Sequence, residues 1–219
     1  MSNDEKPSWN ALAPAQAVLD FWFGAPDDPG HASSRPQWFV KDAAFDASIA
    51  QRFGAVIEQA LAGALTAWAN QPLTASADQP LAAPADKPLA ALALVIVLDQ
   101  FTRNVFRDQA RAFAGDARAL ATARALVAGG ADLGLTGVQR QFVYLPFEHA
   151  EDLSTQRDSL RLFEQLEHDQ PALKGLLDWA KRHHDIIARF GRFPHRNAAL
   201  GRASSAEELA FLQTPGSGF

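Results

Sequence analysis

The sequence contains no cysteine, which excludes a disulfide framework, a thiol nucleophile and a cysteine-ligated zinc site. It also lacks a basic excess: 20 Lys and Arg against 25 Asp and Glu give a formal net charge of −5, which argues against a general nucleic-acid-binding protein. The longest apolar run, Leu89–Leu98, is much shorter than the roughly 20 residues that span a membrane. Residues 1–6 lack the apolar region of a signal peptide. We therefore expect a cytoplasmic protein that binds neither nucleic acid nor membrane.

Two further absences narrow the fold and the chemistry. No stretch alternates apolar and polar residues in the period of a half-buried strand, and there is no glycine-rich phosphate loop or nucleophile elbow. Apolar residues instead recur at spacings of three and four, in a chain long enough for one substantial core. The sequence predicts an all-α domain of about eight helices without a sheet. It spans residues 14–212 between tails at 1–13 and 213–219, with a surface loop at 70–87 that is rich in Pro, Ala and Asp.

Start and stop signals divide this domain into helices. Asp42 is an expected N-cap, Thr136 and Ser204 are each followed three residues later by the Gln or Glu of a capping box, and Gly191 ends the last long helix. The expected helices cover residues 14–23, 42–68, a segment that begins at 86 and includes 99–107, then 115–129, 136–146, 147–168, 171–190 and a short final helix after 204.

A polar arc follows the apolar part of the expected helix that begins at residue 86 and has Pro88 in its first turn. At about 100° per residue, one arc of this helix carries Asp99, Gln100, Arg103, Asn104 and Arg107. Leu92 and Ile96 lie on the same arc in the preceding turns, where the helix is apolar all round. We therefore expect the polar arc to continue a buried surface, either as a pocket wall or as a structural network. The alternative is an ordinary exposed face with an Asp99–Arg103 ion pair.

Two later segments supply complementary side chains. The expected 147–168 helix has an acidic and amide face with Glu148, Asp152, Gln156 and Ser159, and His149 is adjacent to it. The 171–190 helix and the turn after it hold the densest set of hydrogen-bonding side chains, namely His184, Arg189, Arg192, His195, Arg196 and Asn197. His183 falls within the apolar stripe of this helix and is interpreted as a core histidine with satisfied hydrogen bonds.

The segments 98–107, 144–152 and 189–197, together with the opening 18–24, resemble a bacterial family known as domain of unknown function 924. The resemblance covers nearly the whole chain and implies an α-helical fold similar to tetratricopeptide-like arrays. Because no clear 34-residue repeat is visible, the array is implied by the resemblance alone. The sequence departs from the family at Thr102, where proline is more frequent, and in the long loop at 70–87. The family carries no established activity that could be transferred.

One hypothesis is a pocket for a small anionic ligand or a peptide carboxylate. The planar guanidinium group matches the geometry of carboxylate and phosphate. This hypothesis predicts two or more arginines without acidic partners. The candidate ligand-binding residues are Asp99, Gln100, Arg103, Asn104, Arg107, Tyr144, Glu148, Asp152, His184, Arg189, Arg192, His195, Arg196 and Asn197.

A second hypothesis is a hydrolase, either metal-dependent or built on histidine and carboxylate groups. Its candidates are Glu148, His149, Asp152 and His195, of which His149 or His195 would be the base because histidine titrates near neutrality. The spacing matches no diagnostic metal signature, so no metal ligand is assigned, and the cofactor is unknown.

A third hypothesis is an interaction scaffold in which the arginines and acids pair to lock the helices together. Buried ion-pair networks do this without any ligand. The binding surface would then lie elsewhere. The sequence leaves all three hypotheses open.

Overall fold

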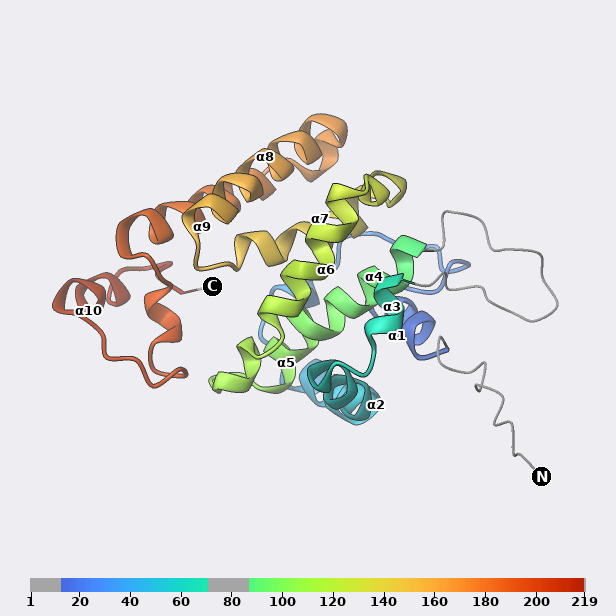
Figure 1. The fold of residues 1–219 in the computed structure, drawn as a ribbon, viewed down its shortest axis with the longest axis horizontal. Helices are drawn as coiled ribbons and strands as arrows, with labels where there is room; N and C mark the ends of the chain where they lie inside the picture. The colour runs from blue at the N-terminus through green and yellow to red at the C-terminus, as the bar shows by residue number, and fades with distance from the viewer. Residues whose placement is uncertain (1–12, 71–86, 219) are drawn as a thin grey trace, which may run out of the picture.

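The computed structural model describes residues 13–70 and 87–218. The predicted N-terminal tail, apart from its last residue, and nearly all of the predicted 70–87 loop lie outside the described residues. Within them the regular structure is helical and no strand is formed, which confirms the all-α fold (Figure 1). The α-helices and the π-helical segment η3 are α1 (Ala13–Phe23), α2 (Ala43–Ala62), α3 (Thr66–Asn70), α4 (Lys87–Val95), η3 (Ile96–Phe101), α5 (Thr102–Val105), α6 (Asp116–Ala128), α7 (Gly137–Glu148), α8 (Leu153–Asp169), α9 (Leu176–Phe190) and α10 (Ala206–Leu212).

The continuous segment α4–η3–α5 is the centre of the molecule. Helices α1, α3, α6 and α7 pack against α4, and α2 packs against η3. The window Pro88–Val105 is long and apolar enough to cross a membrane, with a mean hydropathy of 1.3, but 83% of it is buried inside the protein. This segment is therefore the core helix of the fold, as the apolar run Leu89–Leu98 predicted.

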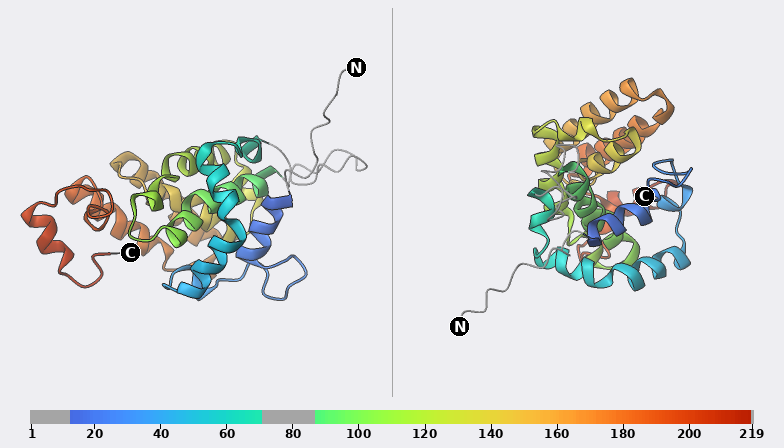
Figure 2. Two further views of the ribbon diagram at one scale, coloured as in Figure 1. Left: turned by 90° about the horizontal axis from the view of Figure 1, so that it is seen from below. Right: turned by 90° about the vertical axis from the view of Figure 1, so that its right-hand side faces the viewer.

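The C-terminal third forms an extension at one end of the molecule. Helices α8 and α9 lie side by side, and α10 lies at the end of the molecule beyond them (Figures 1 and 2). A small second cluster, Ile186, Ile187 and Phe193, packs with the half-buried Phe211 of α10. This extension carries the turn at 191–197 back toward the central segment.

Several helix boundaries follow the predicted local signals. Asp42 Oδ1 accepts hydrogen bonds from the amides of Ala44 and Phe45 at 2.9 and 3.1 Å, and so begins α2 as expected. The Thr136 capping box is formed. The expected 42–68 helix is interrupted, because Gly63 adopts a left-handed conformation (φ 80°) that ends α2 and leaves α3 as a separate short helix.

The boundary between α7 and α8 differs from the prediction. Helix α7 continues through Pro146 to Glu148, and α8 begins only after Asp152, whose side chain accepts from the amide of Thr155 at 2.8 Å. Glu148 and Asp152 are therefore not one turn apart on the same helix. The N-cap signal of Asp152 decides this boundary, because it supplies an acceptor for an amide that has no partner in the first turn.

The C-terminal boundaries differ in detail. The expected 171–190 helix begins with a separate short turn, Pro171–Leu173, before α9. Ser205, not Ser204, is the N-cap of α10, and it forms the capping box with Glu208. Gly191 ends α9 in a left-handed conformation (φ 69°), as predicted.

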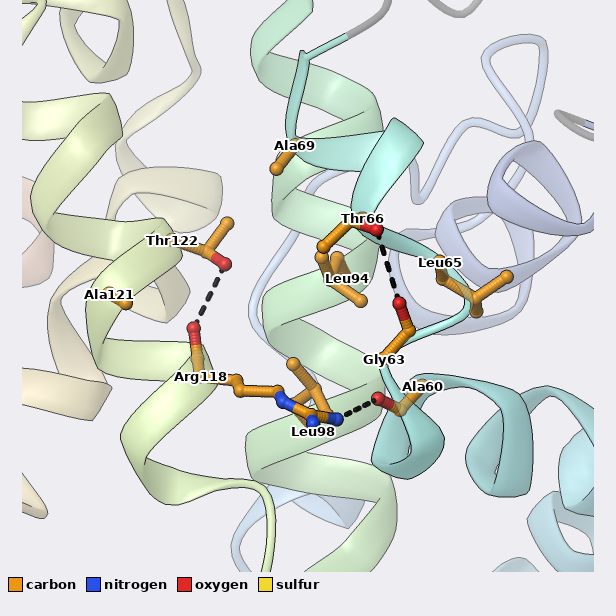
Figure 3. Close-up of a pocket in the computed structure, with 10 residues that line it drawn as sticks. All are labelled: Ala60, Gly63, Leu65, Thr66, Ala69, Leu94, Leu98, Arg118, Ala121 and Thr122. Atoms are coloured by element: carbon orange, nitrogen blue, oxygen red, sulfur yellow. Dashed lines mark hydrogen bonds between the residues drawn. The ribbon is translucent and has the colours of Figure 1, made fainter.

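An apolar pocket of about 180 Å³ lies between the end of α2, α3, α4 and α6 (Figure 3). Its charged neighbour is Arg118, whose guanidinium donates to the carbonyl oxygens of Ala60 and Leu61 and so satisfies the C-terminus of α2. None of the predicted polar site residues lines this pocket.

Candidate functional site

Asp99 is the centre of a buried polar network. It lies in η3, and short π-helical turns are frequently found at functional sites. Its fully buried carboxylate is 2.7 Å from His149 Nδ1 and 3.1 Å from Arg103 Nη1 through Oδ1. Burial alone would raise the pKa of Asp99, but the charge of Arg103 and the contact with His149 hold it well below its ordinary value. Asp99 is therefore ionised.

The network continues from Asp99 through a chain of alternating charges. Arg103 donates to both carboxylate oxygens of Asp116 at 2.8 and 3.0 Å, and to the carbonyl oxygen of Asp99 at 2.8 Å. Asp116 also accepts a 3.2 Å bond from Nη1 of Arg196. The charge of Asp116 is favoured by its place in the first turn of α6, where the helix dipole is positive.

Gly115 allows α6 to begin close to η3. A Cβ at this position would overlap the carbonyl oxygen of Leu98 and lie 2.8 Å from its carbonyl carbon. The φ of Gly115 is −87°, so its backbone conformation does not require glycine. The close approach of α6 to η3 does require glycine, and it places Asp116 within hydrogen-bonding distance of Arg103.

His149 ends α7 and presents one nitrogen to Asp99. Burial and the charge of Arg103 lower the pKa of His149, so the ring is neutral at pH 7. Because ionised Asp99 can only accept, Nδ1 carries the proton and Nε2 keeps its lone pair. Nε2 has no hydrogen-bond partner among the described residues, and the side chain remains 14% exposed. This is the arrangement of a base that is oriented by a carboxylate.

A second histidine–carboxylate pair lies beside the first. His183 Nδ1 is 2.9 Å from Glu148 Oε1 and 2.9 Å from the carbonyl oxygen of Trp179. The ring centroids of His183 and His149 are 6.1 Å apart. His183 is buried, as its position in the apolar stripe predicted. Its 2.9 Å contact with Glu148 makes it part of the polar network.

Arg196 is held in the turn η7 (Pro194–Arg196) between two aromatic rings. Its guanidinium carbon lies 4.7 Å from the ring centroid of Phe113 and 4.6 Å from that of Phe193. The residue is 5% exposed, yet its bond to Asp116 is its one hydrogen bond among the described residues, and Nε is buried without a partner. Burial and the charge of Arg103 lower the pKa of Arg196 to about 10. It remains a cation at pH 7, and a poorly paired one.

His195 precedes Arg196 in the chain and belongs to the same polar network. Its ring centroid lies 5.6 Å from that of Phe193. Burial and the adjacent charge of Arg196 lower the pKa of His195 to about 3, with smaller contributions from His183 and His149. His195 is therefore neutral over the physiological pH range.

The structure thus brings together only part of the predicted site. The predicted residues that meet in this network are Asp99, Gln100, Arg103, Glu148, His149, His195 and Arg196. Asn104 and Arg107 instead bind Asp46 of α2. They leave the expected arc because η3 is wider than an α-helix and because α5 ends at Val105, before Arg107.

Three further candidates have roles outside the network. Tyr144 donates to Asp132 at 2.5 Å and accepts from Arg140, and burial together with Asp132 raises its pKa. Asp152 is the N-cap of α8, and its hydrogen bonds lower its pKa to about 2. His184 pairs with the exposed Asp185 at 3.1 Å.

The remaining candidates stabilise the C-terminal extension. Arg192 donates to both carboxylate oxygens of Glu208, and Arg189 pairs with Glu207. Asn197 bonds Ser204 and accepts from Arg202. These contacts hold the turn at 191–197 in place, so their effect on the network is indirect.

Sequence reasoning missed Asp116 and Phe113, and it assigned no role to Phe193 within the segment 189–197. The Gly115-Asp116 pair was interpreted only as a helix start, although a glycine before an acidic first turn also fits a close helix approach. The two phenylalanines gave no signal beyond apolarity. No group of three or more His, Asp or Glu side chains in the described part of the chain is arranged to hold a metal ion.

The model of a family described as bacterial proteins of unknown function (DUF924) matches residues 18–216. The chain belongs to this family. A solved structure of a protein of unknown function from Agrobacterium tumefaciens is 35% identical to it, with a TM-score of 0.72 over 93% of this chain and 98% of that one. No curated protein matches the chain. DUF924 membership confirms the family resemblance but supplies no activity.

Proposed function

We propose that the protein binds a small molecule through a single carboxylate, with Arg196 as the anion-binding residue. The observation that carries this proposal is the buried guanidinium of Arg196, fixed between two aromatic rings with one 3.2 Å hydrogen bond. A buried charged group with unused donors is costly unless a partner completes it. A carboxylate matches these donors in shape and charge.

The local charge balance favours a ligand with one negative charge. Asp99 and Asp116 already offset Arg103 and Arg196, and Glu148 lies nearby against His183. A dianionic phosphate would add two charges beside three carboxylates, where like charges repel in a low dielectric. A monocarboxylate adds one charge and shares it with Arg196.

The contacts of three other arginines of the predicted pocket support a structural role for those residues, as the scaffold hypothesis expects. Arg107, Arg189 and Arg192 each pair with a carboxylate, and each pair joins two separate segments of the chain. Arg196 also pairs with a carboxylate, that of Asp116, but through a single 3.2 Å bond, and its Nε is buried without a partner among the described residues. The proposal therefore assigns binding to this residue and a structural role to the rest.

We also propose that the protein works in the cytoplasm, without nucleic acid or membrane partners, and that its helices form a tetratricopeptide-like array. The acidic balance and the absence of cysteine support the first part. The packing of α7 on α8 and of α8 on α9 supports the second, because neighbouring helices in such arrays pack in sequence order.

Hexanoate and its neutral isostere hexanamide provide the test of binding. At ten times its dissociation constant, a ligand that binds only the folded protein stabilises it by about 1.4 kcal/mol. For a domain of this size we expect the melting temperature to rise by roughly 3–6 °C. Hexanamide at the same concentration and ionic strength should give no rise, and phosphate should give a smaller one than hexanoate.

Two variants locate the effect. Arg196→Gln should abolish the hexanoate response, because it removes the only cation assigned to the ligand. Arg189→Gln is the matched control, since Arg189 forms an exposed ion pair with Glu207 and should keep the full response. An equal response in the Arg196→Gln variant, or no response in the native protein, would refute the proposal.

A further inference from the structure

We propose that the site is also an active site, in which His149 is the general base of a hydrolase acting on a carboxylate-bearing ester. This inference rests on the proposed function, because the carboxylate is held by Arg196. It adds a reaction, a base and a substrate class to the binding site.

The geometry of His149 supports this role. Asp99 fixes the ring through the 2.7 Å contact to Nδ1, which determines the tautomer and turns Nε2 away from the carboxylate. Asp99 is in turn held by Arg103 and by a 2.6 Å bond from Gln100, so the pair cannot reorient easily. Nε2 is left without a protein partner among the described residues. A purely structural histidine of this kind would normally use both nitrogens.

The exposed pair of His184 and Asp185 differs from the pair of His149 and the buried Asp99. His184 and Asp185 are neighbours in sequence, and His184 Nδ1 lies 3.1 Å from Asp185 Oδ1. The side chain of Asp185 is 79% exposed. Water can replace that contact at little cost. The carboxylate of Asp99 is fully buried, so its effect on His149 is not screened by solvent.

The anion site and the base belong to one network. Asp99, Arg103 and Asp116 link His149 to Arg196 through contacts of 2.7 to 3.2 Å. The charge of Arg196 also contributes to the lowered pKa of His149. In the proposed complex, a short substrate contacts Arg196 at one end and lies near His149 at the other.

The reaction needs only water. His149 Nε2 takes a proton from a water molecule as the water oxygen bonds to the acyl carbon of the ester. The bond between the acyl carbon and the leaving oxygen then breaks, and the imidazolium returns the proton to that oxygen. The products are a carboxylic acid and an alcohol, and His149 is neutral again.

The experiment uses two esters that differ in one charge: the mono-4-nitrophenyl ester of adipic acid and its methyl ester, in which the free carboxylate is blocked. The native protein should hydrolyse the charged ester with a kcat/KM at least about 10-fold above that for the blocked ester. His149→Gln should lower kcat about 100-fold, the ordinary contribution of a general base. Arg196→Gln should remove the preference for the charged ester by raising its KM.

His184→Gln is the matched control, because His184 is also paired with an aspartate but lies at the surface. It should leave both rates unchanged. Hexanoate binding to the His149→Gln variant shows whether that variant is folded and keeps the anion site. The pH profile gives a further readout: removing the charge of Asp99 in Asp99→Asn should move the acidic limb, on which activity rises as His149 loses its proton, to lower pH, since Asp99 raises the pKa of His149 while Arg103 and Arg196 lower it.

The outcomes separate the two proposals. Hexanoate binding without hydrolysis of either ester overturns the hydrolase and leaves the binding site intact. Hydrolysis that survives His149→Gln, or that ignores the carboxylate, also overturns the hydrolase as stated. Absence of hexanoate binding removes the proposed function itself.

Discussion

Arg103 and Arg196 reach the same carboxylate, Asp116, but share it unequally. Arg103 makes two bonds to it, at 2.8 and 3.0 Å, and also contacts Asp99. Arg196 makes a single bond at 3.2 Å. One guanidinium is therefore a structural partner of two buried or partly buried carboxylates, whereas the other is a buried cation with unused donors.

This difference predicts that substitution of Arg103 affects the free energy of unfolding much more than substitution of Arg196. Arg103→Gln should lower the free energy of unfolding by about 3 kcal/mol or more, because it leaves the buried Asp99 without its main counter-charge. Arg196→Gln should change it by no more than about 1 kcal/mol, or raise it, because an imperfectly paired charge is removed from a buried position. Urea denaturation measures both values. A loss of 3 kcal/mol in Arg196→Gln would show that this residue is structural.

Gly115 gives a test of the close contact between α6 and η3. Gly115→Ala places a methyl group against the backbone of Leu98, so we expect a loss of roughly 2–3 kcal/mol and a weaker hexanoate response. Gly54→Ala is the control, because a Cβ there meets nothing within 4 Å in the middle of α2. It should stabilise the protein by about 0.5–1 kcal/mol. Equal effects of the two variants would contradict the packing described.

Stability should decline in mild acid because of His195. Its pKa is about 3 in the folded protein and about 6.5 in an unfolded chain, so the unfolded state binds more protons between these values. The contribution to stability is complete above pH 6.5 and is lost as the pH falls toward 3, with a slope of up to about 1.4 kcal/mol per pH unit. His149 acts in the same direction. Free energies of unfolding at pH 7.5, 6 and 5 should show a shallower slope in His195→Gln than in the native protein.

Asp152 provides a prediction that separates helix capping from chemistry. Asp152→Ala should cost about 1 kcal/mol, the usual effect of losing an N-cap, and should leave hexanoate binding and ester hydrolysis unchanged. Thermal unfolding and the two ester assays measure these quantities on the same sample. A loss of hydrolysis without a loss of stability would return Asp152 to the catalytic candidates.

The parts of the fold that the sequence predicted are those that local chemistry determines. Asp42, the Thr136 capping box and Gly191 each act within one helical turn, so their signals can be read from a few residues. The apolar run Leu89–Leu98 also identified the core helix. The N-cap of α10 was predicted at Ser204 instead of Ser205 because the two adjacent serines offer the same signal, whereas the break between α7 and α8 before Asp152 was not predicted.

The candidate site was only partly predictable because its geometry is not local. The predicted polar arc at Asp99 requires a regular α-helix, whereas η3 is π-helical, and Asn104 and Arg107 contact Asp46. Nothing in the sequence near Asp116 indicates that its partners are Arg103 and Arg196. Such a contact depends on the packing of α6 against η3, which a single sequence does not show.

The contact between Arg196 and Asp116 joins residues 80 positions apart, and this has a consequence for the newly made chain. A polypeptide emerges from the ribosome N-terminus first, and contacts that close long loops form late in folding. The pair of Asp99 and His149 can form once α7 is complete, whereas Arg196 must wait for α9 and the turn after it. A nascent chain would therefore carry the base before it carries the anion-binding group, and the site would become functional only when nearly all of the chain has been synthesised.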